Sequence, residues 1–352
     1  MRFFHVFFFI ACSALAAEPE FSDVFTSDAE GYASIRIPSV IVTKQGTVLA
    51  FAEARIKPTD QAENKIVTKR STDGGRIFLM YQRIPSHLRE QSAGVATGLE
   101  GPDIYRNLLV WSDDDGATWS KPLDVTATTK RPERATTIAS GPGIGIQLTR
   151  GVHEGRLIIP FNEGPFGKWQ NYAVFSDDAG KTWRYGADVP GALVPNGKGG
   201  ERSQINEVQV VEMSDGSVRL DSRQFAGARV RKTSVSHDGG ETWSPIVDLP
   251  ELRDPSCMAG VLRYSFDDGG GHGKMLHTGP DSGKREHGTV YLSLDDGATW
   301  PVKRELWPGG FAYSVPTRFA DGTVACLFEA DKYKRIVFAR FPINWLTENV
   351  KK

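Results

Sequence analysis

The sequence predicts an all-β protein, a six-bladed β-propeller of four-stranded antiparallel blades. The main observation is an eight-residue motif, Ser-x-Asp-x-Gly-x-Thr-Trp, which recurs along the chain. Its four complete copies begin at Ser112, Ser176, Ser236 and Ser293. An incomplete fifth copy begins at Ser71, so successive copies are 41, 64, 60 and 57 residues apart. Repeats of this length with hairpin turns fit propeller blades, and residues 18–352 have room for about six of them.

Each motif copy is expected to form the turn of a β-hairpin. Asp folds its carboxylate onto nearby backbone N–H groups, and Gly accepts a positive φ. The Ser hydroxyl adds a local bond, and the Trp closes the turn by packing a large ring. Strand-like runs precede the copies at 107–111, 172–175, 230–235 and 289–292. An acidic ligand site is the alternative, but the structural role fits all the residue types.

The order of elements has one irregularity, after the incomplete copy. Phe78 stands where the motif has Trp, and residues 77–81 already form the next strand-like run. One blade has therefore lost roughly twenty residues compared with the other intervals. Helices should be few, and the C-terminal segment 344–351 is the one candidate. No low-complexity linker interrupts the chain, so one domain is expected over 18–352.

Residues 1–17 have the features of a signal peptide. Met1-Arg2 is basic, residues 3–13 are rich in Phe, and small residues follow around Ala16. The apolar run is too short to span a bilayer stably, and no other transmembrane candidate is present. The protein is therefore expected to be secreted or periplasmic. An uncleaved anchor, or lipidation at Cys12, remains an alternative.

Composition narrows the function classes. The chain is 39% apolar and 24% charged with a formal net charge of −1, which favours a globular protein and gives no support to nucleic-acid binding. After signal removal only Cys257 and Cys326 remain, and both lie in apolar runs, so free buried thiols are expected. The spacing of His and Cys suggests no metal site, no cofactor is implied, and a monomer is expected.

Charged residues that interrupt strand-like runs mark a candidate site. A single Arg at a strand end is usually a surface cation or part of a structural ion pair. These residues, however, recur at corresponding places in successive repeats, where strand ends of a propeller converge on its axis. Several Arg, several carboxylates and a Tyr would form a site for an anionic ligand. The residues are Arg36, Glu53, Arg55, Asp60, Glu207, Arg223, Arg285, Tyr313 and Glu329.

The order of these motifs resembles that of the exo-α-sialidases of bacteria and animals. Arg36-Ile-Pro comes first, and Glu53-x-Arg55 follows with an Asp five residues later. The repeated motif resembles the family's Asp-box, also called the BNR repeat. Next comes Glu207-x-Gln, with an Arg sixteen residues after that Glu. The resemblance covers nearly all of the chain after the signal peptide, and it implies hydrolysis of terminal sialic acid from glycoproteins, glycolipids or oligosaccharides.

The resemblance also implies roles for the residues. Arg36, Arg223 and Arg285 resemble the arginine triad that grips the substrate carboxylate, a task that suits guanidinium groups. Tyr313 resembles the nucleophile and Glu207 its base, because a phenol with pKa near 10 needs a proton acceptor. Sialidases with a Tyr nucleophile are a known exception to the two-carboxylate rule for glycosidases, and retention through a covalent intermediate is implied.

Three further acids and one Arg complete the implied site. Asp60 resembles the acid/base that protonates the leaving oxygen and then activates water. Arg55 resembles a residue that contacts the substrate near Asp60. Glu53 and Glu329 resemble acids that orient the arginines.

The sequence departs from the family pattern in two places. The shortened repeat after Ser71 removes a segment that the family normally has. Glu133 lies near the expected place of a further acid, but Thr136 and Thr137 occupy positions where bulkier residues are common. Two other functions stay open: a variant that transfers sialic acid, releases an anhydro product or prefers a deaminated sugar, and a non-catalytic propeller that binds glycan or protein.

Overall fold

The protein is all-β in a computed structural model, with 49% of residues in strands and 3% in helices. The structure describes residues 17–29, 31–43, 46–59, 64–70, 76–92, 94–267, 269 and 273–348. Three features expected from the sequence lie outside these residues: the signal peptide up to position 16, Asp60, and the incomplete motif at 71–75. The expected fold class is confirmed at the all-β level.

The strands form antiparallel sheets that follow one another along the chain. The first sheet contains β2 (Ser34–Val42), β3 (Val48–Arg55) and β4 (Asn64–Arg70). The second contains β5 (Ile77–Arg83), β6 (Arg106–Ser112) and β7 (Leu123–Asp124). The third contains β8 (Ile138–Ser140), β9 (Ile146–Gln147), β10 (Leu157–Glu163), β11 (Gln170–Ser176) and β12 (Arg184–Tyr185).

A two-stranded hairpin precedes the larger sheets of the second half. The hairpin is β13 (Leu193–Pro195) and β14 (Glu201–Ser203). The next sheet contains β15 (Ile205–Glu212), β16 (Val218–Gln224), β17 (Val230–Ser236) and β18 (Val247–Arg253). The last sheet contains β1 (Glu20–Thr26), β19 (Gly260–Ser265), β20 (Lys274–Pro280), β21 (Glu286–Ser293), β22 (Val302–Arg318), β23 (Val324–Ala330) and β24 (Arg335–Phe341).

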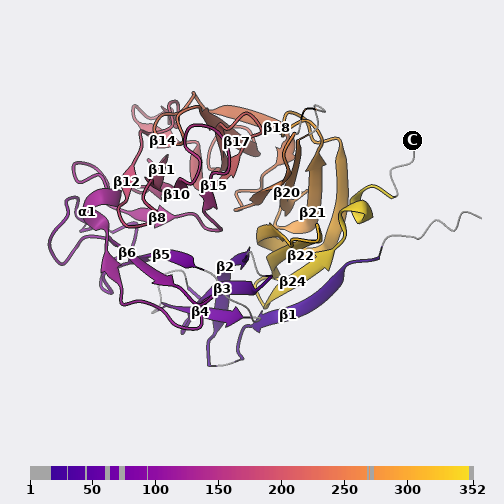
Figure 1. Cartoon of the computed structure of the whole chain (residues 1–352). Helices are drawn as coiled ribbons and strands as arrows, with labels where there is room; N and C mark the ends of the chain where they lie inside the picture. The colour runs from indigo at the N-terminus through magenta and orange to yellow at the C-terminus, as the bar shows by residue number, and fades with distance from the viewer. Residues whose placement is uncertain are drawn as a thin grey trace, which may run out of the picture.

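The seven-stranded sheet joins two four-stranded groups through one long strand. The first part of β22 pairs with β21 and its second part pairs with β23. The group β22-β23-β24 is completed by β1, so the first strand of the chain lies beside the last, as Figure 1 shows in indigo and yellow. Four strands per group, as expected, also occur in β15–β18, whereas β2–β4 and β5–β7 have three described strands each. The number of blades stays a prediction.

The helices differ from the sequence expectation. Among the described residues, helices are limited to α1 (Thr126–Thr129), which was not predicted, and a 3-10 helix, η1 (Ile343–Leu346). The helix expected over 344–351 is therefore present only as this short 3-10 helix in its described part. Trp345 and Leu346 are buried in a core cluster with Phe341, so tertiary packing, not helix propensity, sets this segment.

The complete motif copies form hairpin turns, as predicted. They connect β6 to β7, β11 to β12, β17 to β18, and β21 to β22. In the first copy, the Ser112 hydroxyl donates to Asp114 (2.7 Å), and the N–H and hydroxyl of Thr118 both donate to the Asp114 carboxylate (2.8 and 2.7 Å). These bonds lower the pKa of Asp114 to about 2. The same bonds recur in the copies at Ser176, Ser236 and Ser293.

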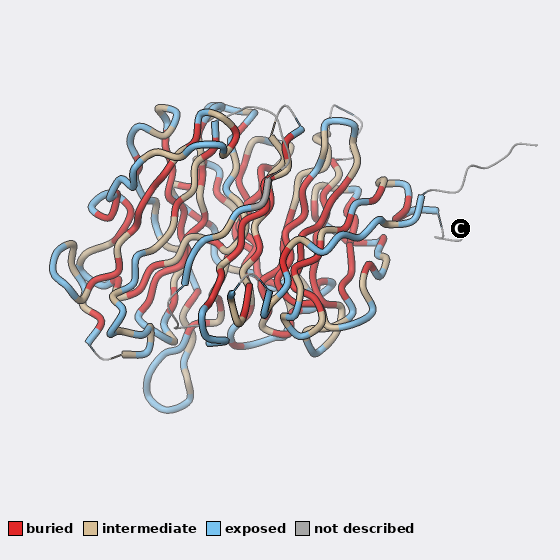
Figure 2. The backbone as a smooth tube through the Cα atoms, turned by 90° about the horizontal axis from the view of Figure 1, so that it is seen from below, coloured by how far each residue is buried: buried red, intermediate tan, exposed pale blue. Residues whose placement is uncertain are grey.

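The motif Trp residues pack as the sequence predicts. Trp183, Trp243 and Trp300 are buried, and Trp119 meets Phe51 edge-on at 6.1 Å between ring centres. Figure 2 shows that buried backbone follows the strands, while the loops at both strand ends are exposed. The motif is therefore a structural element of the sheets, because its Asp carboxylates are occupied by bonds within the turn.

Cys257 and Cys326 are free and buried, which confirms the expectation. Burial raises the pKa of each thiol to about 12, so neither forms a reactive thiolate near neutral pH.

A buried ion network holds the segment that follows β18. Arg231 donates to Asp221 (2.7 Å) and Asp254 (2.9 Å), and all three side chains are at most 1% exposed. Asp254 also accepts the backbone N–H groups of Gln224 and Cys257. Such a network is costly to break, because removal of one partner leaves buried charges uncompensated.

Replacement of the buried guanidinium should destabilise the fold. We expect Arg231→Leu to lower the free energy of unfolding by about 3–5 kcal/mol, because two buried carboxylates lose their counterion. The control is Arg184→Ala, which removes an exposed cation paired with Asp177 and should cost less than about 1 kcal/mol. Urea unfolding measures both variants, and equal effects would contradict the network's role.

His277 should make stability depend on pH. It is 1% exposed, and burial lowers its pKa from 6.5 to about 3. Below pH 6.5, His277 binds a proton in the unfolded chain but stays neutral in the folded protein. The free energy of unfolding therefore falls by up to about 1.4 kcal/mol for each pH unit that the pH decreases. His277→Gln should have a shallower decline between pH 6.5 and 4.5 in urea unfolding. Parallel curves for both proteins would show that another group is responsible.

Candidate active site

Three site residues lie where the first strand of a group starts irregularly. Arg36 is in β2, Glu207 in β15, and Tyr313 in the second part of β22. In each strand the pairing register shifts at or beside this residue. Such bulges bend a strand and re-aim side chains, and they are common next to active sites. Ile37 has a φ of 56° directly after Arg36, which marks the same irregularity in β2.

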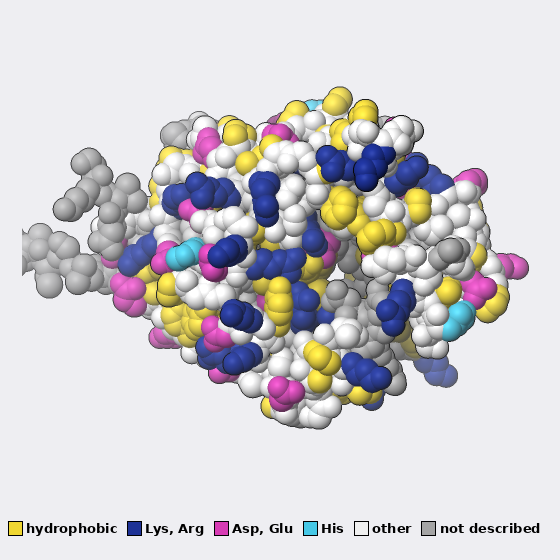
Figure 3. All heavy atoms as spheres, turned by 180° about the vertical axis from the view of Figure 1, so that it is seen from behind, with side chains coloured by type: hydrophobic (Ala, Val, Ile, Leu, Met, Phe, Trp, Pro, Cys, Tyr) yellow, Lys and Arg dark blue, Asp and Glu magenta, His cyan; other side chains and the backbone are white. Residues whose placement is uncertain are grey.

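The other site residues come from neighbouring strand ends. Glu53 and Arg55 end β3, Arg223 lies near the end of β16, and Glu329 lies near the end of β23. Arg285 directly precedes β21. Because β21 runs from this end to a motif turn, the site lies at the strand ends opposite the motif turns. Lys and Arg side chains border a hollow near the middle of the face shown in Figure 3.

Tyr313 is the point where the three predicted arginines meet. The Arg36 and Arg285 guanidinium carbons lie 5.4 and 5.3 Å from the centre of its ring. Arg223 donates from Nη1 to the Tyr313 hydroxyl at 3.0 Å. The structure therefore brings together residues that are 277 positions apart in the sequence, from Arg36 to Tyr313.

Glu207 is hydrogen-bonded to the same hydroxyl. The Tyr313 hydroxyl donates to Glu207 Oε1, and the other Glu207 oxygen accepts from Arg223 at 2.6 Å. Burial, then the negative charge of Glu207, raises the pKa of Tyr313 well above 10. The phenol is thus neutral at ordinary pH, and its hydrogen bond provides a path for the proton to a carboxylate.

Glu329 fixes the position of Arg36 and of the backbone around the site. Its side chain is fully buried, and its two oxygens accept from Arg36 Nε (2.9 Å) and Nη2 (3.0 Å). The same carboxylate accepts the backbone N–H groups of Ile37 (2.9 Å) and Tyr313 (3.3 Å). This bidentate pair holds the guanidinium plane in one orientation.

Two contacts of Arg285 were not foreseen from the sequence. Arg285 donates to the Tyr333 hydroxyl (3.1 Å) and to the Ser256 carbonyl (2.7 Å). The Tyr333 ring also lies 4.0 Å from the Arg36 guanidinium. Tyr333 and Ser256 have positive φ values of 71° and 60°, which is uncommon for such residues and concentrates at functional sites. The signal in the sequence was only a Tyr four residues after Glu329.

The remaining predicted residues are Glu53, Arg55, Asp60 and Glu133. Glu53 lies directly opposite Arg36 in the β2–β3 register and accepts from Arg55 at 2.7 Å. Arg55 is buried at 4% exposure. Because Glu53 lies opposite Arg36, the ion pair of Glu53 with Arg55 adjoins the site. Asp60 lies outside the described residues and its role stays a prediction. Glu133 is exposed.

Glu163 is a buried acid in the third sheet, which contains β8 to β12. The sequence patterns did not single it out. It ends β10 and accepts from Arg134 Nε (2.8 Å), and Arg131 Nη1 lies 3.0 Å from the same oxygen. Burial raises the pKa of Glu163, and this effect outweighs the charges of Arg131 and Arg134, which lower it.

Comparison with known proteins identifies the family. The family described as BNR repeat-like domain matches residues 90–326. A sialidase of Micromonospora viridifaciens is 32% identical over 92% of this chain. The chain belongs to the BNR repeat-like domain family, and the relatives that it matches are sialidases. An anhydrosialidase of Macrobdella decora is 31% identical over 67% of the chain. The chain spans 54% of the length of the Micromonospora protein and 32% of the Macrobdella protein.

Solved sialidase structures have the same fold. The Hadza microbial sialidase Hz136 has a TM-score of 0.77 at 25% identity, over 90% of this chain and 67% of that one. The intramolecular trans-sialidase from Ruminococcus gnavus, solved with oseltamivir carboxylate, has a TM-score of 0.77 at 22% identity, over 92% of this chain and 98% of that one. Because its identity is below 25%, the similarity to the Ruminococcus gnavus structure shows the fold alone.

The described residues hold neither a cluster of metal ligands nor a membrane-spanning helix. No group of three or more His, Cys, Asp or Glu is placed there to hold a metal ion. None of the helices in this part of the chain is long and apolar enough to cross a membrane.

The Glu329 carboxylate should be needed for anion binding. In Glu329→Gln one oxygen can still accept a hydrogen bond, but the counterion of Arg36 is lost and its guanidinium is free to turn. We expect the affinity for free sialic acid to fall about tenfold, measured by NMR titration. The control is Glu241→Gln in a motif turn, at the opposite strand ends. Equal affinity in all three proteins would contradict a positioning role for Glu329.

Proposed function

We propose that the protein is an exo-α-sialidase that hydrolyses terminal sialic acid from glycoconjugates with retention of configuration. The observation that carries this proposal is the Tyr313 hydroxyl, hydrogen-bonded to Glu207 and Arg223 inside a group of three arginines. Guanidinium groups bind carboxylates bidentately, through two parallel hydrogen bonds, and keep their charge at every accessible pH. Sialic acid carries such a carboxylate on the carbon that reacts.

The first chemical step would form a bond between Tyr313 Oη and the anomeric carbon. As this bond forms, the phenol proton passes to Glu207, and the bond to the leaving oxygen breaks. The nearby charge of Arg223 stabilises the developing negative charge on Oη. Because the phenol pKa is raised, proton transfer has to accompany the attack. Asp60 is proposed as the acid that protonates the leaving oxygen.

The second step would release the sugar from Tyr313. Water, deprotonated by Asp60, attacks the anomeric carbon, and the tyrosyl oxygen leaves and regains its proton from Glu207. Two inversions restore the original configuration. The proposal assigns substrate binding to the arginines, with Glu53 and Glu329 as acids that orient Arg55 and Arg36 through the ion pairs described above.

We extend the proposal to the organisation of the protein. Residues 18–352 would form one catalytic domain, a six-bladed propeller, with the four-stranded groups and the four regular motif turns as support. Residues 1–17 would act as a signal peptide for a secreted or periplasmic enzyme that works as a monomer on sialylated glycans.

A second candidate differs only in the final acceptor. Relatives include a protein named anhydrosialidase and structures titled intramolecular trans-sialidase. In such a reaction, a hydroxyl of the sugar itself would attack the anomeric carbon in place of water. The product would then be lighter than free sialic acid by one water molecule, so mass spectrometry of the product separates the two candidates.

Hydrolysis of a fluorogenic α-sialoside by residues 18–352 tests the proposal. We expect turnover by the wild type and a loss of at least about a thousandfold in kcat for Tyr313→Phe, since the nucleophile is removed. The control is Tyr264→Phe, which removes a hydroxyl that donates to the Gly322 carbonyl and, among the described residues, makes no hydrogen bond with Arg36, Arg223 or Arg285.

The controls separate the outcomes. Full activity in Tyr313→Phe would refute the nucleophile assignment. No turnover by folded wild type, with sialic acid still bound, would favour a non-catalytic glycan-binding protein.

A further inference from the structure

Two arginines occupy an unfavourable position in the second sheet. Arg83 ends β5 and Arg106 begins β6, and the two residues are direct partners in the antiparallel register. Directly opposite residues in a sheet project from the same face, close to each other. Like charges in such a pair destabilise a sheet. The register therefore places two guanidinium groups beside each other on one face of the sheet.

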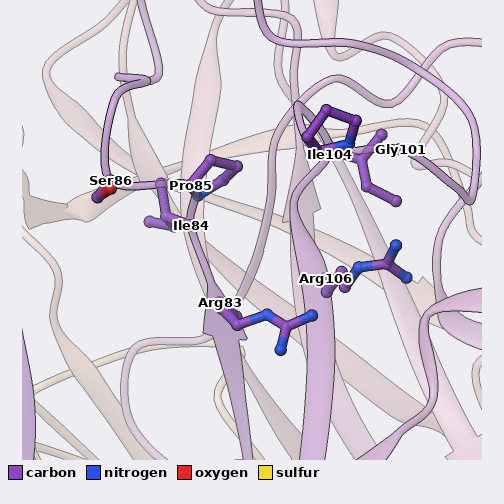
Figure 4. A pocket seen from close by; sticks show the side chains of 8 residues that line it. Arg83, Ile84, Pro85, Ser86, Gly101, Ile104 and Arg106 are labelled. Carbon is purple, nitrogen blue, oxygen red and sulfur yellow. The ribbon is translucent and has the colours of Figure 1, made fainter.

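The pair lines a cavity. The cavity has a volume of about 460 Å³, within the range of small-molecule sites. Figure 4 shows both guanidinium groups extending to the same side of it. Its lining residues are Arg83, Ile84, Pro85, Ser86, Gly101, Pro102, Ile104 and Arg106. Two cations beside a few apolar groups suit an anionic group on an organic molecule.

The positive charges of Arg83 and Arg106 at the cavity are only partly compensated. Arg106 Nη1 contacts Asp124 (3.2 Å) and the Leu99 carbonyl (3.3 Å). Arg83 makes no side-chain hydrogen bond or ion pair within the described chain.

The cavity lies at the same strand ends as the site around Tyr313. β6 runs from Arg106 to the motif turn at Ser112, just as β21 runs from the vicinity of Arg285 to the turn at Ser293. Counted from the residue opposite the motif Ser, Arg83 in β5 corresponds to Gln224 in β16, one residue beyond Arg223. In addition, β5 forms one edge of its sheet as described, whereas β16 is flanked on both sides. The short interval after Ser71 thus leaves β5 without a strand on that side.

We propose that this cavity is a second anion-binding subsite, which takes a carboxylate or a sulfate ester on the glycan beyond the sugar held at Tyr313. The inference rests on the proposed function for the identity of the ligand as a glycan. The carboxylate could come from a second sialic acid, and the sulfate from a sulfated inner sugar. Both present oxygens that two neighbouring guanidinium groups can bind together.

Arg83→Gln is the informative variant, because Arg83 is exposed and has no structural partner to lose. Arg253→Gln is the matched control: it removes an exposed Arg from β18, the outermost strand of its sheet. We compare kcat/KM for a disialylated oligosaccharide, a sialylated and sulfated one, and a sialylated one without a second anion. The wild type should prefer at least one doubly anionic substrate by about tenfold.

Arg83→Gln should lose this preference and keep its activity on the singly charged substrate, while Arg253→Gln should keep both. The substrate that loses its advantage identifies the source of the anion. Equal ratios in all three proteins, or equal loss on every substrate, would overturn the proposal.

A binding measurement keeps the subsite testable if no substrate is turned over. Lactose 6-sulfate, which carries a sulfate but no sialic acid, is titrated into wild type and Arg83→Gln by calorimetry. We expect at least about tenfold weaker binding by the variant. Equal binding would refute the subsite, whereas lack of turnover with intact Arg83-dependent binding would refute only the hydrolase function. Arg83→Gln should also be no less stable than wild type, since it removes a like-charge pair.

Discussion

The concentration of three guanidinium groups around one tyrosine is the constraint on which the rest of the site depends. Cations this close repel one another, and each is partly removed from water, so the fold must supply counterions in fixed places. Glu329 does so for Arg36, and Glu207 for Arg223. Arg285 has instead a carbonyl and a phenol as acceptors. This leaves Arg285 the least neutralised of the three, which suits its proposed role in binding the substrate carboxylate.

The same counterions link binding to chemistry. Glu207 neutralises Arg223 and also accepts the hydrogen bond of the Tyr313 hydroxyl, so one carboxylate is both the counterion and the proposed base. Glu329 holds Arg36 and the backbone N–H of Tyr313. The bulges in β2, β15 and β22 turn these residues out of the regular ladder, and the motif turns at the opposite strand ends stabilise the sheets that carry them.

Residue patterns predicted most of this arrangement, because repeated turns and charged residues at strand ends are local signals. The all-β fold, the hairpin motifs and the buried thiols follow from them. Tyr333 and the buried Glu163 with its exposed partner Arg134 were missed, since a contact between a strand and a distant loop leaves no periodic trace. The C-terminal helix was overestimated because apolar packing of Trp345 outweighs local propensity. The short interval after Ser71 indicated a loss of chain, but not the pairing of Arg83 with Arg106 that accompanies it.

The central claim is that Tyr313 forms a covalent bond to the sugar, and its most direct test is to find that bond. The protein is mixed with a rapidly cleaved aryl α-sialoside, quenched in acid within milliseconds, and analysed by peptide mass spectrometry. We expect one sialyl residue on the peptide that contains Tyr313 in wild type, and none in Glu207→Gln. A sialyl group on Glu207 or another residue, or turnover without any adduct in burst kinetics, would contradict it.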